Sequence, residues 1–448
     1  MKVPLPLLDE FRNSSELKKF LRPKNLYRIA RDVGFIARSR KLTASAFLGI
    51  CSFFPKPSSY PTLEAMCAEL AGSYRIHMRP ESLWERFGPE AVAFMKEVLA
   101  QALKVEFGQM FGFKGLSDFA EIFAMDSTSI HLDEKCAAEF RGSGGVAGAS
   151  AAKVQFCFGL LGGSVRELDL HHGTRSDAGH RVRDVVYNAL YLFDLGYFGA
   201  ENFKAIIEGG GWFISRFKYD AALYHPDGRP ISREALDRLV AKLKPGRTLD
   251  MEVLLFQNAR IPVRLVLTKL KPALGDQIRD KLIKDKGRKG ERLSPGRLAF
   301  CHVNAFITNI PQEKMPADKL RAIYSLRWQV EIMFKCWKSG LGLDKVRNVG
   351  PWQFQCILYG GLLRMLLCQR IFWKAKTVCW KLKGVELSEL KGMRYLQESI
   401  DKAREWMVTK KRKNASFLSE IWEKLTKSCV KHRKKADLSP FETIQFYA

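Results

Sequence analysis

The sequence feature that most constrains this chain is the stretch 323-IYSLRWQVEIMFKCWK-338. No Gly or Pro interrupts it before Ser339 and Gly340, so the pattern predicts one continuous helix. At about 100° per residue, its large apolar residues fall on one side and predict a stripe that faces a core. The residues of this stripe are Ile323, Leu326, Val330, Met333, Phe334 and Trp337.

Another side of the predicted helix gathers one carboxylate among cations and a phenol. The residues on this side are Tyr324, Arg327, Glu331, Lys335 and Lys338. Arginine, lysine and tyrosine suit phosphate oxygens, and a glutamate suits a hard divalent cation. The alternative is an amphipathic helix whose charged face is only solvated. The residue types therefore indicate a phosphate or metal site, and the rest of the chain bears on the choice.

Length, composition and charge restrict the class of protein. The 448 residues have room for about two to four domains, and a hydrophobic content of 46% fits a globular chain. The 74 Lys and Arg residues outnumber the 47 Asp and Glu residues, which gives a formal net charge of +27. Such an excess predicts a polyanionic partner, with nucleic acid as the first candidate and an anionic membrane surface as the second.

Membrane and disulfide signals are weak. The most apolar stretch, 354–368, is interrupted by Arg364 and predicts a buried helix rather than a membrane span. The N-terminus lacks the layout of a secretory signal. Ten Cys residues are scattered without a C-x-x-C pair, which argues against a zinc ribbon or a disulfide framework and indicates a reducing cytoplasm.

Two aspartates stand at apolar runs that resemble strands. Asp126 lies within 121-EIFAMDSTSIHL-132, and Asp194 ends the run of 186-VYNALYLFDLGYF-198. A buried carboxylate needs a partner, and a metal ion is one such partner. For Asp126, the alternative is a strand-end carboxylate that accepts local hydrogen bonds from Ser127 or Thr128. Asp194 is expected at the carboxyl end of a strand, where sheet proteins collect their sites.

The interleaved residues carry a family resemblance. Tyr324, Arg327, Glu331 and Lys338, with Trp328 after the Arg and Trp337 before the Lys, form the Tyr-Arg-Glu-Lys signature. Over about residues 120–340 the chain resembles the DDE transposases of bacterial insertion sequences, family four, which are related to composite-transposon cut-and-paste transposases. The resemblance implies an α/β, ribonuclease-H-like (retroviral-integrase-type) core that a mainly β insertion interrupts, with helical N- and C-terminal regions.

The predicted organisation has five regions. Strands at 249–256 and 261–270, a helix at 233–243 and a basic loop at 281–292 mark the insertion between Asp194 and Glu331. The regions are a helical, DNA-binding domain (1–118), the first part of the core (119–219), the β-rich insertion (220–300), the last strand and Glu-bearing helix of the core (301–373) and a basic helical C-terminal region (374–448).

The resemblance also implies a chemistry. Asp126, Asp194 and Glu331 would be the catalytic residues and would hold two Mg²⁺ ions, for which Mn²⁺ would substitute. The activity would be DNA cleavage at the element ends and joining of the 3′-OH ends to target DNA. The implied DNA-binding residues are Tyr324, Arg327 and Lys338, which would hold phosphates near a flipped-out nucleotide and the scissile bond, together with Lys335 and Trp328.

One departure from the family concerns base stacking. Relatives that extrude a base stack it on a Trp of the insertion, but this chain has no Trp between Trp212 and Trp328. The replacement is open among Phe256, Phe300, Tyr224, Trp212 and Trp328.

The partners implied are double-stranded DNA, as terminal inverted repeats and target, and a second copy of the chain in the DNA complex, without a membrane. The place implied is the bacterial cytoplasm beside the nucleoid. Two other functions stay open: a metal-dependent, structure-specific nuclease of the same fold, and a transposase-derived regulator that binds DNA without cutting it.

Overall fold

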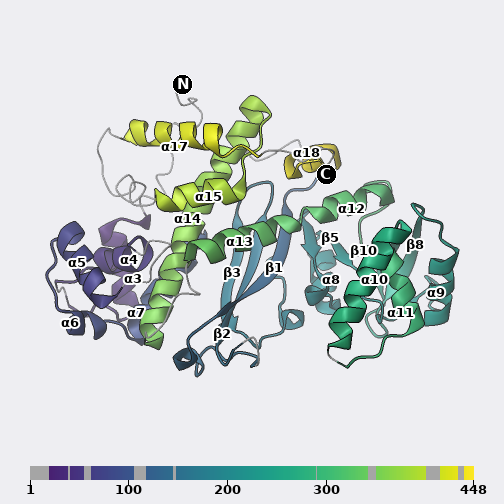
Figure 1. Cartoon of the computed structure of the whole chain (residues 1–448), viewed down its shortest axis with the longest axis horizontal. Coiled ribbons are helices and arrows are strands. Elements are labelled where there is room, and N and C mark those ends of the chain that lie inside the picture. The colour runs from purple at the N-terminus through teal and green to yellow at the C-terminus, as the bar shows by residue number, and fades with distance from the viewer. Residues whose placement is uncertain are drawn as a thin grey trace. The chain divides into compact units, whose positions relative to one another are not determined.

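The chain divides into two compact units, each described here by itself. The computed structural model describes residues 20–38, 41–54, 62–104, 118–144, 148–288, 290–341, 350–399, 414–431 and 438–447 (Figure 1). The first unit comprises Met1–Phe113, Ser127–Arg175 and Val330–Ser439, and the second comprises Lys114–Asp126, Ser176–Gln329 and Pro440–Ala448. The fold is mixed α/β.

The first unit begins with helices that start at capping threonines or at prolines. Thr43 and Thr62 cap α4 and α5 by accepting hydrogen bonds from the backbone N–H groups of Ala46 and Ala65. Proline occupies the start of α3, α6 and α7, where its missing N–H costs nothing. The helices are α3 (Pro23–Asp32), α4 (Ala44–Ser52), α5 (Leu63–Tyr74), α6 (Pro80–Trp84) and α7 (Pro89–Lys104).

A long buried helix is the centre of this unit. Helix α14 (Pro351–Lys383) packs against α4, α7 and α15 (Glu389–Glu398), and α17 (Asn414–Ser428) also contacts it. It ends at Gly384, whose φ of 60° favours glycine. Within the described part of the chain, α14 is the one helix long and apolar enough to cross a membrane. Because 94% of its apolar window is buried inside the protein, it is a core helix, as the sequence predicts.

The first unit also contains an antiparallel hairpin. Strands β2 (Ala151–Gly159) and β3 (Val165–His172) pair antiparallel, in the order β3-β2-β1 with β1 (Ile122–His131). In the first unit, Phe156 of β2 packs 5.7 Å from Phe334 and 4.6 Å from Trp337, measured between ring centroids. Both rings come from α13 (Trp328–Leu341), and every residue of the predicted apolar stripe is buried.

The second unit is built on a sheet whose order is β1-β4-β5-β10-β9-β8-β6-β7. Strands β1, β4 and β5 are parallel, and the other pairings in this unit are antiparallel. Buried apolar runs form the central strands, as expected for a sheet that is covered on both faces. The strands are β4 (Leu190–Phe193), β5 (Trp212–Arg216), β6 (Leu223–Tyr224), β7 (Pro230–Ile231), β8 (Thr248–Leu255), β9 (Ile261–Lys269) and β10 (Val303–Thr308).

Helices complete the second unit. The predicted basic loop at 281–292 is wrong over its first half, because α10 continues to Gly287 with no Gly or Pro from Asp276 to Lys286. The last helix of the chain, α18, packs on α12 (Figure 1). The helices are α8 (Ala200–Glu208), α9 (Arg233–Lys242), α10 (Pro272–Gly287), α11 (Pro295–Ala299), α12 (Ala317–Ser325) and α18 (Pro440–Tyr447). The 3₁₀ helices of the two units are η1 (Glu134–Cys136), η3 (Asp177–Gly179), η4 (Leu195–Tyr197) and η5 (Phe300–His302).

The prediction of one continuous helix over 323–338 is wrong. Helix α12 ends at Ser325 and α13 begins at Trp328. Between them, the backbone N–H groups of Leu326 and Arg327 donate to carbonyls three residues back, which is the tighter 3₁₀ pattern. Arg327 in this turn is 9% exposed and forms an ion pair with a side chain of the sheet. A long-range contact has therefore interrupted a helix that local propensity favours.

Candidate active site

Asp126 in the middle of β1 and Asp194 directly after β4 lie side by side by the register of these two parallel strands. The pairing of β1 with β4 places Ala124 opposite Leu192, and two residues further along each strand the same register places Asp126 opposite Asp194. Neighbouring strands are about 4.8 Å apart, and paired residues of parallel strands point to the same face. The sheet therefore presents two carboxylates next to each other.

The backbone around Asp194 leaves its carboxylate available for a ligand. Asp194 is extended (φ −87°, ψ 172°), so it continues the line of β4, which is buried along its whole length. It also precedes the helix η4, yet its side chain makes no capping hydrogen bond to that helix. The usual structural role of an aspartate before a helix is therefore absent at this position.

Asp126 is held by a cation in this structure. Nη1 of Arg327 lies 2.8 Å from Oδ2 of Asp126, and the two side chains are 11% and 22% exposed. The predicted role of Arg327 is to hold a phosphate, and here its guanidinium contacts a carboxylate of the candidate site. Because the pair is largely shielded from water, its attraction is screened less than that of a surface pair.

Tyr324, on α12, lies near the candidate site. Its ring centroid lies 4.9 Å from that of Phe306 on β10, and Cζ of Arg327 lies 6.0 Å from the Tyr324 ring. Burial raises the pKa of Tyr324, and the nearby charge of Asp194 raises it further. The phenol is therefore kept protonated, which leaves it a hydrogen bond donor beside the carboxylates.

The structure adds Arg216, which the sequence analysis does not single out. Strand β5 pairs with β4 so that Ser215 lies opposite Phe193, and the next step places Arg216 beside Asp194. On its other side, β5 pairs with β10, and this pairing places Arg216 opposite Phe306, the residue that packs on Tyr324. Asp126, Asp194 and Arg216 thus occupy one row across three adjacent strands. The signal that could have found Arg216 is the one that marks the aspartates, a charged residue directly after an apolar strand.

The other predicted site residues lie on α13. Trp328 begins this helix in the second unit and is 51% exposed. The remaining three predicted site residues belong to the first unit. One is a half-buried carboxylate and two are exposed cations. Their spacing places all three on one side of α13. They are Glu331, Lys335 and Lys338.

The donor set fits a hard divalent cation. Asp126 and Asp194 offer carboxylate oxygens only, and oxygen ligands suit Mg²⁺ or Mn²⁺ better than softer metals. Within the residues that the structure describes, no group of three or more His, Cys, Asp or Glu side chains is arranged to hold a metal ion. Of the three predicted metal ligands, the second unit therefore supplies the two aspartates.

These features define a class of protein. A mixed α/β chain that presents two aspartates on adjacent parallel strands, beside arginine and tyrosine, has the groups for metal-assisted chemistry on phosphates. The family described as "Transposase DDE domain" matches residues 117–367, which is more than half of the chain. The chain therefore belongs to the DDE transposase family.

Its curated relatives are insertion-sequence transposases. The transposase for insertion sequence element IS1151 of Clostridium perfringens is 29% identical over 399 residues, which cover 84% of each chain. The transposase for IS231B of Bacillus thuringiensis subsp. berliner is 26% identical over 406 residues, covering 86% of this chain and 85% of the relative. These relatives support a role in DNA transposition. Among solved structures, a piggyBac transposase synaptic complex with hairpin DNA has a TM-score of 0.44 at 12% identity, covering 90% of this chain and 82% of that one.

Proposed function

We propose that this chain is a cut-and-paste transposase that cleaves DNA at the ends of its insertion sequence and joins the freed 3′-OH ends to target DNA. The observation that carries the proposal is the strand register that places Asp126 beside Asp194. Family membership and the Tyr-Arg-Glu-Lys signature support it further.

We propose a ribonuclease-H-like architecture for the core. Its supports are the parallel pairing of β1, β4 and β5 in the second unit and the antiparallel hairpin of β2 and β3 next to β1 in the first. The insertion at 220–300 adds β6 to β9, and its last strand pairs with β10. In the proposed organisation this insertion contacts DNA.

The proposed ligands are Asp126, Asp194 and Glu331, the last assigned by the sequence signature. Two divalent ions, Mg²⁺ with Mn²⁺ as a substitute, would supply activation of the attacking water or 3′-OH and stabilisation of the leaving 3′ oxygen. The aspartates are pre-positioned by strand pairing, so little reorganisation is needed to bring them together. The catalytic contribution of the chain is positioning and charge stabilisation, because phosphoryl transfer requires no covalent intermediate with the protein.

The groups beside the carboxylates would bind the DNA strand. Tyr324 offers a protonated phenol, and Arg327 offers a planar fork that matches two phosphate oxygens. Lys335 and Lys338 would add point charges from α13, and the exposed indole of Trp328 would contact bases. We expect Arg327→Ala to weaken end processing more than nonspecific DNA binding.

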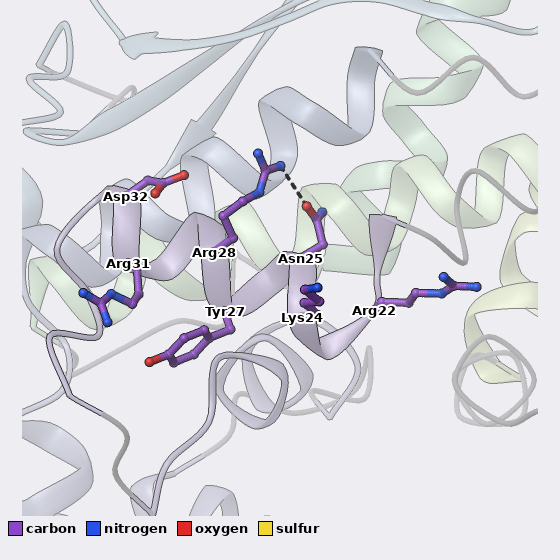
Figure 2. A pocket seen from close by; sticks show the side chains of 7 residues that line it. All are labelled: Arg22, Lys24, Asn25, Tyr27, Arg28, Arg31 and Asp32. Atoms are coloured by element: carbon purple, nitrogen blue, oxygen red, sulfur yellow. Dashed lines mark hydrogen bonds between the residues drawn. The ribbon is translucent and has the colours of Figure 1, made fainter.

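The proposed DNA-binding role of the N-terminal region has a candidate surface on α3. Leu26, Ile29 and Ala30 anchor one side of this helix in the core. The other side lines an open hollow in which Arg28 is oriented by a 2.9 Å hydrogen bond to Oδ1 of Asn25 (Figure 2). The residues that line the hollow are Arg22, Lys24, Asn25, Tyr27, Arg28, Arg31 and Asp32. Four cations and one carboxylate on this surface favour a phosphate backbone.

The remaining parts of the proposal concern assembly and place. The C-terminal region at 374–448 is proposed to supply the contact between two copies of the chain in the DNA complex. A transposase that acts on chromosomal DNA would work in the bacterial cytoplasm beside the nucleoid. No membrane takes part in this function.

The test is strand cleavage on linear DNA that carries the sequences flanking the coding region. Reactions with Mg²⁺, with Ca²⁺ and without metal are compared for the natural chain and for Glu331→Gln. We expect a Mg²⁺-dependent nick at one defined position, and a loss on the order of a thousandfold in the variant with DNA binding retained. Cleavage by Glu331→Gln would overturn the assigned site. Cuts that follow DNA structure instead of the flanks would indicate a nuclease, and binding without any cut a regulator.

A further inference from the structure

We infer that Arg216 binds a phosphate of the DNA strand that is cut, as the third member of the row formed with Asp126 and Asp194. This inference rests on the proposed function, because it assigns another contact to the same substrate. It concerns a residue outside the Tyr-Arg-Glu-Lys signature and outside the three carboxylates.

The first argument is position. The register of β4 with β5 places Arg216 beside Asp194, and the register of β1 with β4 places Asp194 beside Asp126. Paired residues of parallel strands share a face, at a spacing of about 4.8 Å per strand. A phosphate held next to the two carboxylates through a divalent ion therefore comes within reach of the longer Arg216 side chain.

The second argument is availability. Ser215 and Phe217 are buried at 0% and 4% exposure, whereas Arg216 between them is exposed. Among the residues that the structure describes, Arg216 takes part in no ion pair within 4.0 Å. It differs in this respect from Arg327, whose guanidinium is engaged by Asp126. Arg216 is thus the cation of the row that can accept a ligand without giving up an ion pair.

The third argument is the set of side chains around Arg216. It lies opposite Phe306 on β10, and the ring of Phe306 packs against Tyr324 at 4.9 Å. The charge of Asp194 raises the pKa of Tyr324 and the charges of Arg327 and Arg216 lower it, which agrees with the strand register that brings these groups near one another. Two cations and a phenol around paired carboxylates match a phosphodiester bound with divalent ions.

The experiment is a binding cycle between the side chain and individual phosphates. A duplex that carries the flanks of the coding region is prepared with a neutral methylphosphonate at one position at a time. Its binding to the natural chain, to Arg216→Gln and to Arg216→Lys is measured by fluorescence anisotropy in Ca²⁺, so that a divalent ion can bridge the carboxylates and the phosphate. Lys204→Gln on α8, which removes an exposed cation of the same unit outside the insertion, is the matched control.

We expect Arg216→Gln to weaken binding of the natural duplex about tenfold, as for the removal of one charge-assisted hydrogen bond. The effect should vanish at one methylphosphonate position, where the phosphate charge that Arg216 binds is already absent, and Arg216→Lys should restore part of the affinity. Lys204→Gln should change binding by less than about twofold.

Two results would overturn the inference. One is an equal loss of affinity for Arg216→Gln and Lys204→Gln, and the other is a loss that no methylphosphonate position abolishes. If Arg216→Gln fails to fold, the scan on the natural chain decides, since sensitivity at a single phosphate next to the nick site is still required. Because the measured quantity is binding in Ca²⁺ and not strand cleavage, the outcome is independent of whether the chain cleaves DNA.

Discussion

Nη1 of Arg327 lies 2.8 Å from Oδ2 of Asp126, so the cation proposed to hold phosphate neutralises the carboxylate proposed to hold metal. The pair joins residues that are 201 positions apart in the sequence. It keeps an arginine and an aspartate paired at a largely buried position, where an unpaired charge is costly. A metal ion that binds Asp126 has to compete with this guanidinium.

Removal of Arg327 is therefore expected to strengthen metal binding while it weakens DNA processing. In the absence of DNA, Arg327→Gln should bind Mn²⁺ about tenfold more tightly, because a competing charge-assisted hydrogen bond is gone. Isothermal titration or the electron paramagnetic resonance signal of free Mn²⁺ measures the affinity. Arg216→Gln is the control, since it removes a nearby cation that is not paired with Asp126. Equal gains in Mn²⁺ affinity in the two variants would mean that the effect comes from the loss of positive charge near the site and not from the pair with Asp126. A weaker Mn²⁺ affinity in Arg327→Gln would contradict the prediction.

A second prediction identifies the residue that stacks on an extruded base. Phe300 is 7% exposed, and Tyr224 is covered by the guanidinium of Arg260, which lies 3.2 Å from its ring centroid. Trp212 lies at the opposite end of β5 from Arg216 and donates a hydrogen bond to Asn188. Phe256 is half-buried against Phe198 and Phe203.

Trp328, which is 51% exposed and follows Arg327 directly, has the exposed ring surface that stacking needs. We expect Trp328→Ala to retain the first nick and to reduce a hairpin product about tenfold, since base stacking contributes about 1–3 kcal/mol. Gel analysis of products and the fluorescence of 2-aminopurine beside the nick measure the two steps. Trp84→Ala, which removes a 57% exposed indole on α6, should leave both unchanged. An unchanged hairpin yield in Trp328→Ala would contradict this assignment and leave Phe256 as the candidate for base stacking.

A third prediction concerns α3. The double variant Arg28→Gln with Arg31→Gln should bind duplex DNA more weakly. The slope of log K against log salt should fall by about 0.9 for each phosphate that the variant no longer neutralises. Titrations at several salt concentrations without divalent ions give this slope. The double variant Lys391→Gln with Lys424→Gln removes the same charge from exposed positions of α15 and α17 and should leave the slope nearly unchanged. Identical slopes in the two double variants would mean that the α3 face is only solvated.

A fourth prediction concerns stability. Nζ of Lys376 is fully buried on α14, 2.8 Å from Glu386 and paired also with Glu389. Burial opposes the charged form, but the two carboxylates raise the pKa of Lys376 above its ordinary value. Burial likewise opposes ionisation of Glu389, yet the charge of Lys376 lowers its pKa. Lys376→Met should therefore cost about 3–5 kcal/mol of unfolding free energy at pH 8, because it leaves two buried carboxylates without their buried cation, and only the more distant Lys431, 3.8 Å from Glu386, remains.

The pH dependence of this deficit has a definite sign. In the natural chain, the lowered pKa of Glu389 means that its contribution to stability is lost as the pH falls. In Lys376→Met, burial without Lys376 raises the carboxyl pKa values above those of the natural chain, so protonation stabilises the variant as the pH falls. The difference in unfolding free energy should be smaller at pH 5 than at pH 8, as urea denaturation would show. Lys424→Met, at an exposed position, should change stability by less than about 0.5 kcal/mol. A deficit that grows toward pH 5 would contradict the account.

Local sequence patterns predict much of the secondary structure near the site. The apolar runs before Asp126 and Asp194 are strands, and the apolar stripe of Val330, Met333 and Trp337 is buried. Both patterns are readable because alternation and helical periodicity act over a few residues. The same local signal fails at Leu326 and Arg327, where the ion pair with Asp126 ends α12. It also fails to single out Arg216, whose significance depends on its neighbours in the sheet.

By itself, the sequence determined which residue types the chain offers for phosphate and metal chemistry, at which strand ends and on which helix side. It did so because spacing within one element is set by backbone geometry. Only the tertiary structure decided that Asp126, Asp194 and Arg216 form one row and that Arg327 is paired with Asp126. The physical reason is that strand register and buried ion pairs depend on contacts between segments far apart in the chain, where one step of register would turn each side chain to the other face.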